Sequence, residues 1–195
     1  MHKIAISGKA NSGKNTVSKF LIDGIKERLG DEFKGGKIIA LADPIKEMAR
    51  IMFPDIPRKY FFGPSKYRSS IIPNAFKNEQ PLTIRQVLID IGTGLGRTYR
   101  DSLWLDNFDI KFNKYLNNSA LIVSDVRFRN EFNHLKEKGF YQIRLKRETF
   151  LKLDDISETN QDSIEDLEFD CLLHNNSSLD ELHKDVNKIL DIIIK

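Results

Sequence analysis

The chain has 195 residues, of which 40% are hydrophobic and 30% charged, as in a single globular domain with a sizeable core. Lys and Arg exceed Asp and Glu by only 31 − 28 = 3, so the charge balance points to neither a nucleic-acid polymer nor a membrane surface. No membrane span or signal peptide is expected. The single cysteine, Cys171, excludes an internal disulfide and suits the cytoplasm.

The N-terminal segment predicts a phosphate site. Residues 3–7 form a short apolar run typical of a buried parallel strand. The motif G-x-x-x-x-G-K follows at 8–14, and apolar residues then recur at helical spacing over 14–29. A strand, a glycine-bounded loop and a helix in this order are the context that a phosphate loop requires. The alternative is a glycine-rich turn that opens an ordinary helix.

Within this loop, Gly8 and Gly13 allow backbone angles that expose N–H groups, and the helix N-terminus adds partial positive charge. Lys14 is expected to be exposed without ligand and to reach the β- and γ-phosphates. Asn15 stands where a Ser or Thr is expected, and Thr16 supplies a hydroxyl one place later. We therefore expect Thr16 to make the main hydroxyl contact with the phosphates or a metal.

A second strand is predicted at 37–41 and a helix at 43–52. Asp43 followed by Pro44 is typical of a helix N-cap with proline at the first helical position. Asp43 also falls at the expected C-terminal edge of the sheet, near a ligand crevice. A cap and a ligand contact are compatible, and the cap is the stronger expectation.

Residues 53–81 carry most of the prolines and predict an irregular connection into a helical insertion. A helix predicted at 83–98 has an apolar stripe and ends in three glycines, which let the backbone approach something flat or charged. The arginines around it would suit a monophosphate, and the alternative is a solvated basic face. They are Arg85, Arg97 and Arg100.

The only tryptophan, Trp104, lies in a helical stretch predicted at 103–116. It could stack on a nucleobase or close the space beside a sugar 2′-position. A lone tryptophan in a helix is more often part of the core.

The strand predicted at 120–124 runs into Asp125, a carboxylate at a strand end beside the phosphate loop. Asp125 could hold a metal through water or orient the attacking phosphate. Arg127 could bind a second phosphate bidentately, and Glu131, on a helix predicted at 129–138, could fix Arg127. The alternative is that Asp125 and Arg127 simply pair with each other.

The remaining predicted elements are strands at 141–145 and 169–174 and a helix at 178–194. Residues 147–168 are acidic and poor in apolar side chains, which indicates a surface loop or lid. Strands that alternate with helices predict an α/β fold with a parallel sheet covered on both faces.

Five blocks of sequence, in order, resemble the bacteriophage-type deoxynucleoside monophosphate kinases. They are Ser7–Thr16, Leu41–Lys46, Gly92–Arg97, Leu103–Trp104 and Asp125–Glu131. The resemblance implies a P-loop kinase fold with a five-stranded parallel sheet flanked by helices. It also implies a single domain over 1–195, with a monophosphate-binding insertion at 43–116 and a short lid at 147–168.

The activity implied by the resemblance moves the γ-phosphoryl group of ATP to a deoxynucleoside 5′-monophosphate, with Mg²⁺ as cofactor. The partners are then these nucleotides, in the cytoplasm of the cell or of a phage host, and a homodimer is left open.

The resemblance and the residue patterns together give the expected site. The ATP side would comprise Gly8, Asn11, Ser12, Gly13, Lys14, Asn15, Thr16 and Arg147. The monophosphate side would comprise Asp43, Lys46, Arg85, Gly92, Thr93, Arg97 and Trp104. The reacting centre would comprise Lys14, Asp125, Arg127 and Glu131, and the metal contacts would be Thr16 and Asp125.

Two departures from the family pattern and one difference from the related adenylate kinases stand out. Asn15 replaces an Asp that is frequent there, which removes a charge near the metal. Arg129 replaces the usual Pro, which is expected to disturb only the start of its helix. The acidic stretch 154–168 lacks the arginines of adenylate kinase lids, so charge neutralisation is expected from Arg144 or Arg147.

Two other functions fit parts of the sequence. One is a dephospho-coenzyme A kinase or another small-metabolite kinase on the same fold. The other is a regulatory nucleotide-binding module such as a small GTPase. That class reads guanine with Asn-Lys-x-Asp, and neither Asn113-Lys114 nor Asn187-Lys188 is followed by Asp at the required place.

Overall fold

The structure is a computed structural model that describes residues 1–148 and 159–194. The chain divides into two compact units. The first comprises Met1–Leu41 and Asp109–Lys195, and the second comprises Ala42–Phe108. The bounds of the second unit are close to those predicted for the insertion, 43–116. Residues 149–158, the central part of the predicted lid, lie outside the described residues.

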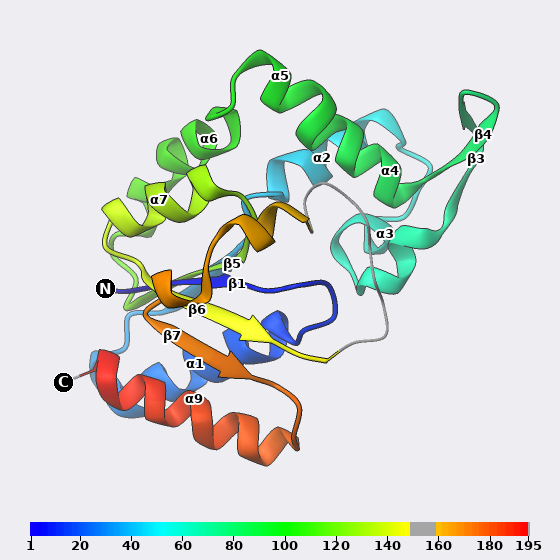
Figure 1. Cartoon of the computed structure of the whole chain (residues 1–195). Helices are drawn as coiled ribbons and strands as arrows, with labels where there is room; N and C mark the ends of the chain where they lie inside the picture. The colour runs from blue at the N-terminus through cyan, green and yellow to red at the C-terminus, as the bar shows by residue number, and fades with distance from the viewer. Residues whose placement is uncertain (149–158, 195) are drawn as a thin grey trace. The chain divides into compact units, whose positions relative to one another are not determined.

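A five-stranded parallel sheet forms the centre of the first unit (Figure 1). Its strands are β1 (His2–Ser7), β2 (Gly36–Ile39), β5 (Ala120–Val126), β6 (Tyr141–Lys146) and β7 (Cys171–His174). Their order is β2-β5-β1-β6-β7, and every neighbouring pair is parallel. The predicted α/β class and the five-stranded parallel sheet are therefore confirmed.

Helices cover both faces of this sheet. Helices α1 (Lys14–Leu29) and α9 (Leu179–Ile193) lie side by side on one face, and α7 (Arg129–Glu137) lies on the other (Figure 1). Alternation along β1 explains both layers, because successive side chains of a strand point to opposite faces. Ile4 and Ile6 join the core beneath α1 and α9, and Ser7 faces the other side. None of the helices in the described part of the chain is long and apolar enough to cross a membrane.

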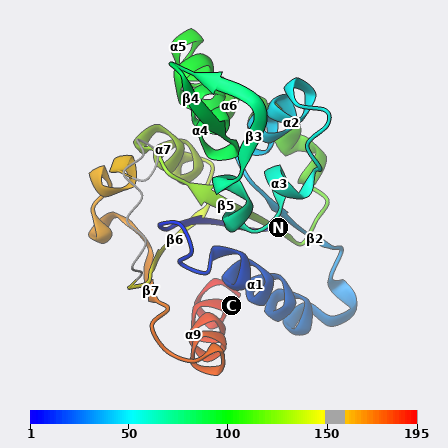
Figure 2. The same ribbon diagram turned by 90° about the vertical axis from the view of Figure 1, so that its right-hand side faces the viewer.

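Parallel strands bring all their C-terminal ends to one edge of the sheet, which Figure 2 views end-on. The loop after β1 and the segments that follow β5, β6 and β7 meet there. Ligands of open α/β sheets bind at this kind of edge. The short helices η5 (Asn160–Ser163) and η6 (Asp166–Glu168) lie on the same face of the sheet as α7.

The second unit is mainly helical, with one β-hairpin. Its elements are α2 (Asp43–Met52), α3 (Lys59–Phe62), η2 (Ser65–Ser69), β3 (Ile71–Lys77), β4 (Gln80–Thr83), α4 (Ile84–Ile89), η3 (Asp90–Gly96) and α5 (Arg97–Tyr99). Helix α6 (Leu103–Phe112) begins in this unit. A core that includes Ile45, Phe61, Ile84 and Trp104 holds these elements together.

One expectation for the second unit is wrong. Residues 71–83 form the antiparallel β3–β4 hairpin, where the sequence predicted an irregular connection. Its turn places Asn78 and Glu79 at φ of 50° and 65°, the left-handed region that tight hairpin turns use. The prolines of this segment argued against strands in the sequence, because a central strand does not tolerate proline. A short isolated hairpin does tolerate it. The helix predicted at 83–98 is confirmed as a continuous helical run from α4 to α5, of which Asp90–Gly96 forms the wider π-helical segment η3.

Candidate functional site

The loop between β1 and α1 has the backbone of an anion-binding turn. Gly13 has a φ of +101° and Asn11 a φ of 61°, and Gly13 directly precedes the first residue of α1. A side chain at Gly8 would place its Cβ 2.7 Å from the carbonyl oxygen of Leu145. Gly13 is therefore required by its backbone conformation, and Gly8 by the close approach of the Leu145 carbonyl. The turn brings backbone N–H groups to a helix N-terminus, as phosphate binding requires.

Lys14 folds back over its own loop. Its Nζ donates hydrogen bonds to the carbonyl oxygens of Gly8 and Lys9, and the side chain is half-buried. The expectation that Lys14 is exposed without ligand is therefore wrong, because loop carbonyls offer the ammonium a partner. An arriving phosphate would have to compete with these carbonyls for Nζ.

The first turn of α1 contains no acidic residue. Asn15 is exposed, Thr16 is half-buried and Asn11 is exposed. Ser12 is buried, and its hydroxyl has no hydrogen-bond partner. The α1 N-terminus therefore carries no side-chain negative charge of its own against an anion.

Asp125 joins two strand ends. Its Oδ1 accepts a hydrogen bond of 2.7 Å from the backbone N–H of Leu41, which lies two residues beyond β2. The neighbouring Ser124 hydroxyl donates to the carbonyl of Ile39. Asp125 is half-buried at the C-terminal edge of the sheet, so one oxygen has a structural partner at the position where a metal-associated carboxylate was predicted.

Glu131 holds the backbone that carries Arg127. Its Oε2 accepts hydrogen bonds from the N–H groups of Arg127 and Phe128, at 2.8 and 3.1 Å. Glu131 is buried and stands in the first turn of α7, where a carboxylate satisfies N–H groups that the helix leaves unpaired. The predicted support of Arg127 by Glu131 thus acts through the backbone.

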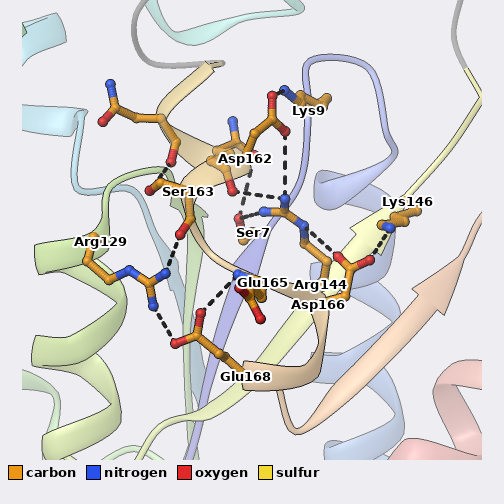
Figure 3. Close-up of polar contacts among 12 residues, drawn as sticks. Ser7, Lys9, Arg129, Arg144, Lys146, Asp162, Ser163, Glu165, Asp166 and Glu168 are labelled. Atoms are coloured by element: carbon orange, nitrogen blue, oxygen red, sulfur yellow. Dashed lines mark hydrogen bonds and ion pairs between the residues drawn. The ribbon is translucent and has the colours of Figure 1, made fainter.

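Arg144 is a buried cation at the sheet edge. Its guanidinium donates to the Ser7 hydroxyl at 3.0 Å and to the Gln161 carbonyl at 2.9 Å, and it faces Asp166 at 3.6 Å (Figure 3). Burial lowers the pKa of Arg144, whereas Asp166 and Asp162 raise it, and an arginine remains charged in proteins. These groups already pair with the charge of Arg144. Of the two arginines expected to neutralise nucleotide phosphates, Arg147 is the exposed one and is therefore the better candidate.

The acidic segment 160–168 is held by cations from the phosphate loop, α7 and β6 (Figure 3). Asp162 pairs with Lys9 of the phosphate loop at 2.7 Å, and Asp166 pairs with Lys146. Arg129 contacts the Glu168 carboxylate and the Ser163 carbonyl, and its hydrogen bond lowers the pKa of Glu168. The prediction that Arg129 affects only the start of its helix is therefore wrong: it anchors this segment.

A pocket of about 590 Å³ opens between the phosphate loop, the ends of β6 and β7, and the acidic segment. Cations and carboxylates line it together, including Lys9, Arg147, Asp162 and Glu165. It borders the phosphate loop through Lys9. Its place at this loop makes it a candidate for part of a bound nucleotide.

In the second unit, the cap predicted at Asp43 is wrong by one residue. Ala42 is the N-cap residue, Asp43 is the first residue of α2, and no side chain caps this helix. The Asp43 carboxylate instead accepts from Lys46 Nζ at 2.7 Å. A first-turn carboxylate still favours the helix through the macrodipole, which explains the misleading signal.

The glycines of η3 serve the packing of Trp104. The indole Nε1 donates to the Gly92 carbonyl at 2.9 Å, and a Cβ at Gly96 would lie 2.2 Å from the indole ring. Trp104 is only 6% exposed. The flat group that these glycines approach is this indole, so a contact between Trp104 and a base would have to be indirect, through the Gly92–Thr93 backbone.

The arginines predicted on the monophosphate side differ in their surroundings. Arg97 pairs with Asp101 at 2.8 Å and its side chain is only 9% exposed. Arg100 pairs with Asp106, and Arg85 is half-buried. Among the described residues, no group of three or more His, Cys, Asp or Glu side chains is placed to hold a metal ion.

A comparison with known protein families identifies the family of this chain. Residues 62–186, more than half of the chain, match the sequence profile of the deoxynucleotide monophosphate kinase family. The chain belongs to this family. It is therefore a kinase that transfers a phosphoryl group to a nucleoside monophosphate. The matched region includes Trp104, Asp125 and Arg127 but begins after the phosphate loop.

Two individual proteins are similar to this kinase. A protein of Acanthamoeba polyphaga mimivirus, provisionally named deoxynucleotide monophosphate kinase, is 27% identical over 200 residues, which cover 96% of this chain and 95% of the relative. A dephospho-CoA kinase from Campylobacter jejuni is similar in structure, with a TM-score of 0.43 and 15% identity over 97% of this chain and 96% of that chain.

The sequence did not single out Asn175. It follows β7 at the same sheet edge and its side chain reaches the phosphate loop. Its position directly after a predicted strand was the available signal, but asparagine is common in turns. The contact depends on how β7 lies beside β6 and β1, which a local pattern does not reveal.

Proposed function

We propose that this kinase transfers the γ-phosphoryl group of ATP to a deoxynucleoside 5′-monophosphate, with Mg²⁺, and releases ADP and a deoxynucleoside diphosphate. The observation that carries the proposal is the strand–loop–helix unit of β1 and α1, with a left-handed Gly13 and with Lys14 at the helix N-terminus. Asp125 lies near the C-terminal end of the neighbouring strand β5, and Arg127 directly follows it at the same edge. Phosphoryl transfer depends on positioning and positive charge, and these groups can supply both.

On the donor side, the backbone N–H groups of residues 8–16 would bind the β- and γ-phosphates, and Lys14 would exchange its loop carbonyls for phosphate oxygens. Gly8, Asn11, Ser12 and Gly13 would act through the backbone of the loop. Arg147 is exposed at the pocket beside the loop and would neutralise charge there.

Mg²⁺ suits the residues present. This ion keeps several waters and is usually held by one or two protein groups together with substrate phosphates. The Thr16 hydroxyl and Asp125, the latter through water, would be those groups, since one Asp125 oxygen already accepts from Leu41. When bound, the ion would neutralise charge on the phosphates. Asn15 would add only a neutral amide.

At the reacting centre, Arg127 would span donor and acceptor phosphates with its planar fork. Glu131 would position it by fixing its backbone N–H. No general base is needed, because a monophosphate dianion is already a nucleophile.

The second unit would bind the acceptor. Arg85, Lys46 and Arg97 would supply positive charge, and Gly92 and Thr93 would present backbone that Trp104 holds in place. Asp43 would orient Lys46 through their ion pair.

The half-buried Cys171 fits a reducing cytoplasm, where we place the enzyme.

A coupled assay of ADP release tests the proposal, with ATP, Mg²⁺ and a panel of ribo- and deoxynucleoside monophosphates. We expect ADP to form only when a monophosphate is added, and faster with deoxy acceptors. Turnover of dephospho-coenzyme A alone would indicate a small-metabolite kinase. A rate of ADP release that is the same with and without each acceptor would contradict the kinase proposal.

A further inference from the structure

Asn175 sits at a rigid point of the sheet edge. Its backbone N–H donates to the Lys146 carbonyl at 2.8 Å, which continues the parallel pairing of β7 with β6 by one residue. The residue is only 8% exposed. Its side chain therefore projects from the end of an ordered strand pair and is not free to swing with a surface loop.

The side chain reaches across to the phosphate loop. Its Nδ2 donates a hydrogen bond of 2.8 Å to the carbonyl oxygen of Ser12. A Cβ added to Gly13 would lie 2.3 Å from the same nitrogen. The amide thus fills the space that a side chain at Gly13 would need, next to the residue that adopts a φ of +101°.

The contact determines the direction of a peptide group. In a trans peptide, the carbonyl and the N–H of the next residue point in opposite directions. A bond that holds the Ser12 carbonyl toward Asn175 therefore turns the Gly13 N–H the other way. That N–H stands immediately before α1, where the backbone donors of a phosphate loop converge on the anion.

We propose that Asn175 is a positioning residue for phosphoryl transfer: it holds the Ser12–Gly13 peptide in the orientation that binds the donor phosphates. It acts through Ser12 and does not itself touch the nucleotide. The inference rests on the proposed function, since it requires the loop after β1 to be the donor phosphate site.

The chemistry of asparagine suits this task. The amide is a neutral donor, so it bonds a carbonyl without adding charge beside the phosphates. An ionised carboxylate at this position would instead repel both the Ser12 carbonyl and the phosphates, whereas a protonated carboxyl could donate to that carbonyl. Asn175→Asp therefore converts the donor into one that depends on pH.

The chain offers a matched control in Asn118. Its Nδ2 also donates to a backbone carbonyl, that of Tyr115, at 3.0 Å. It precedes β5, at the edge of the sheet opposite the phosphate loop. Asn118→Ala removes the same kind of hydrogen bond without touching the loop.

The experiment measures steady-state kinetics with each substrate varied in turn for the parent enzyme, Asn175→Ala, Asn175→Asp and Asn118→Ala. We expect Asn175→Ala to lower kcat/KM for ATP about tenfold and to leave KM for the monophosphate within about twofold. Asn118→Ala should match the parent within about twofold in both. Calorimetry with inorganic tripolyphosphate should show the same loss of affinity for Asn175→Ala alone.

The Asn175→Asp variant distinguishes positioning from simple packing. Its kcat/KM for ATP, relative to the parent enzyme at the same pH, should rise as the pH falls from about 7 toward about 5, because the ordinary aspartate pKa of about 4 is raised by burial and the carboxyl then regains a proton to donate. A packing role predicts a constant ratio. If Asn175→Ala is too unstable to assay, this pH profile decides the question.

An Asn175→Ala enzyme with kcat/KM for ATP within about twofold of the parent would overturn the proposal, as would a flat ratio for Asn175→Asp. Lys14→Ala in the same series separates this failure from failure of the proposed function. An active Lys14→Ala variant would refute the phosphate loop itself, whereas an inactive one beside a normal Asn175→Ala would refute only the role of Asn175.

Discussion

The guanidinium of Arg144 donates to the hydroxyl of Ser7 at 3.0 Å, and the two residues are register partners in β6 and β1. Ser7 immediately precedes the phosphate loop, and Arg144 also donates to the carbonyl of Gln161. One buried cation thus joins the start of the phosphate loop to the acidic segment 160–168. A charge so far from solvent is stable only while its polar partners stay in place.

We expect Arg144→Met to lower the free energy of unfolding by about 1–3 kcal/mol, because it removes the donor to the buried Ser7 hydroxyl and one of two donors to the Gln161 carbonyl. Urea denaturation measures the loss. Lys188→Met is the control, since Lys188 forms an exposed pair with Asp185 and such pairs contribute little. Equal stability of the two variants would show that the Arg144 network is energetically neutral.

Lys14→Ala should reduce kcat/KM for ATP by about 10²–10³-fold, the usual effect of removing one preorganised donor from a charged transition state. Lys14 is only half-buried and bonds carbonyls of its own loop, so the unfolding midpoint should change little. Coupled ADP release and thermal unfolding test the two parts separately. Near-normal turnover by a folded variant would refute the donor site.

Thr16→Val should lower turnover more than Asn15→Ala, and Thr16→Ser should recover part of the loss. The reason is that a hydroxyl can contact a phosphate oxygen or Mg²⁺, whereas the exposed Asn15 offers a neutral amide. Turnover over a range of Mg²⁺ concentrations measures the ranking. The reverse order would mean that Asn15 makes the metal contact.

Arg127→Lys should depress turnover much more than it weakens ATP binding, since lysine keeps the charge but loses the bidentate fork. Calorimetry gives the ATP affinity, and coupled ADP release gives kcat. Glu131 contacts the backbone N–H of Arg127, which the substitution does not change, so we expect the local fold of the variant to be that of the parent enzyme. An effect confined to ATP affinity would place Arg127 on the donor side only.

Gly96→Ala should destabilise the second unit by about 1–3 kcal/mol, as overpacking of a core does. The new Cβ would lie 2.2 Å from the ring of Trp104, which is held by its bond to Gly92. Gly94→Ala is the matched control, because a Cβ there meets nothing within 4 Å. Urea unfolding followed by tryptophan fluorescence compares them, and equal midpoints would show that the indole can move aside.

Much of the first unit, and the first helix of the second, follow from local sequence. Apolar runs with period 2 and stripes with period 3.6 are short-range properties, so α1 and α2 begin and end where the sequence predicts. The phosphate loop was also recognisable, because its glycines and lysine act within one turn of backbone. The five-stranded parallel sheet followed from the alternation of strands and helices.

Contacts between distant segments were decided by the tertiary structure alone. The pairing of Arg144 with Ser7, the anchoring of the acidic segment by Arg129 and the bond from Asn175 to Ser12 depend on which strands become neighbours. The π-helical segment at Asp90–Gly96 contains Gly92, whose carbonyl accepts a hydrogen bond from the indole N–H of Trp104. Such positions depend on the packing of whole elements, and local periodicity carries no information about distances between elements.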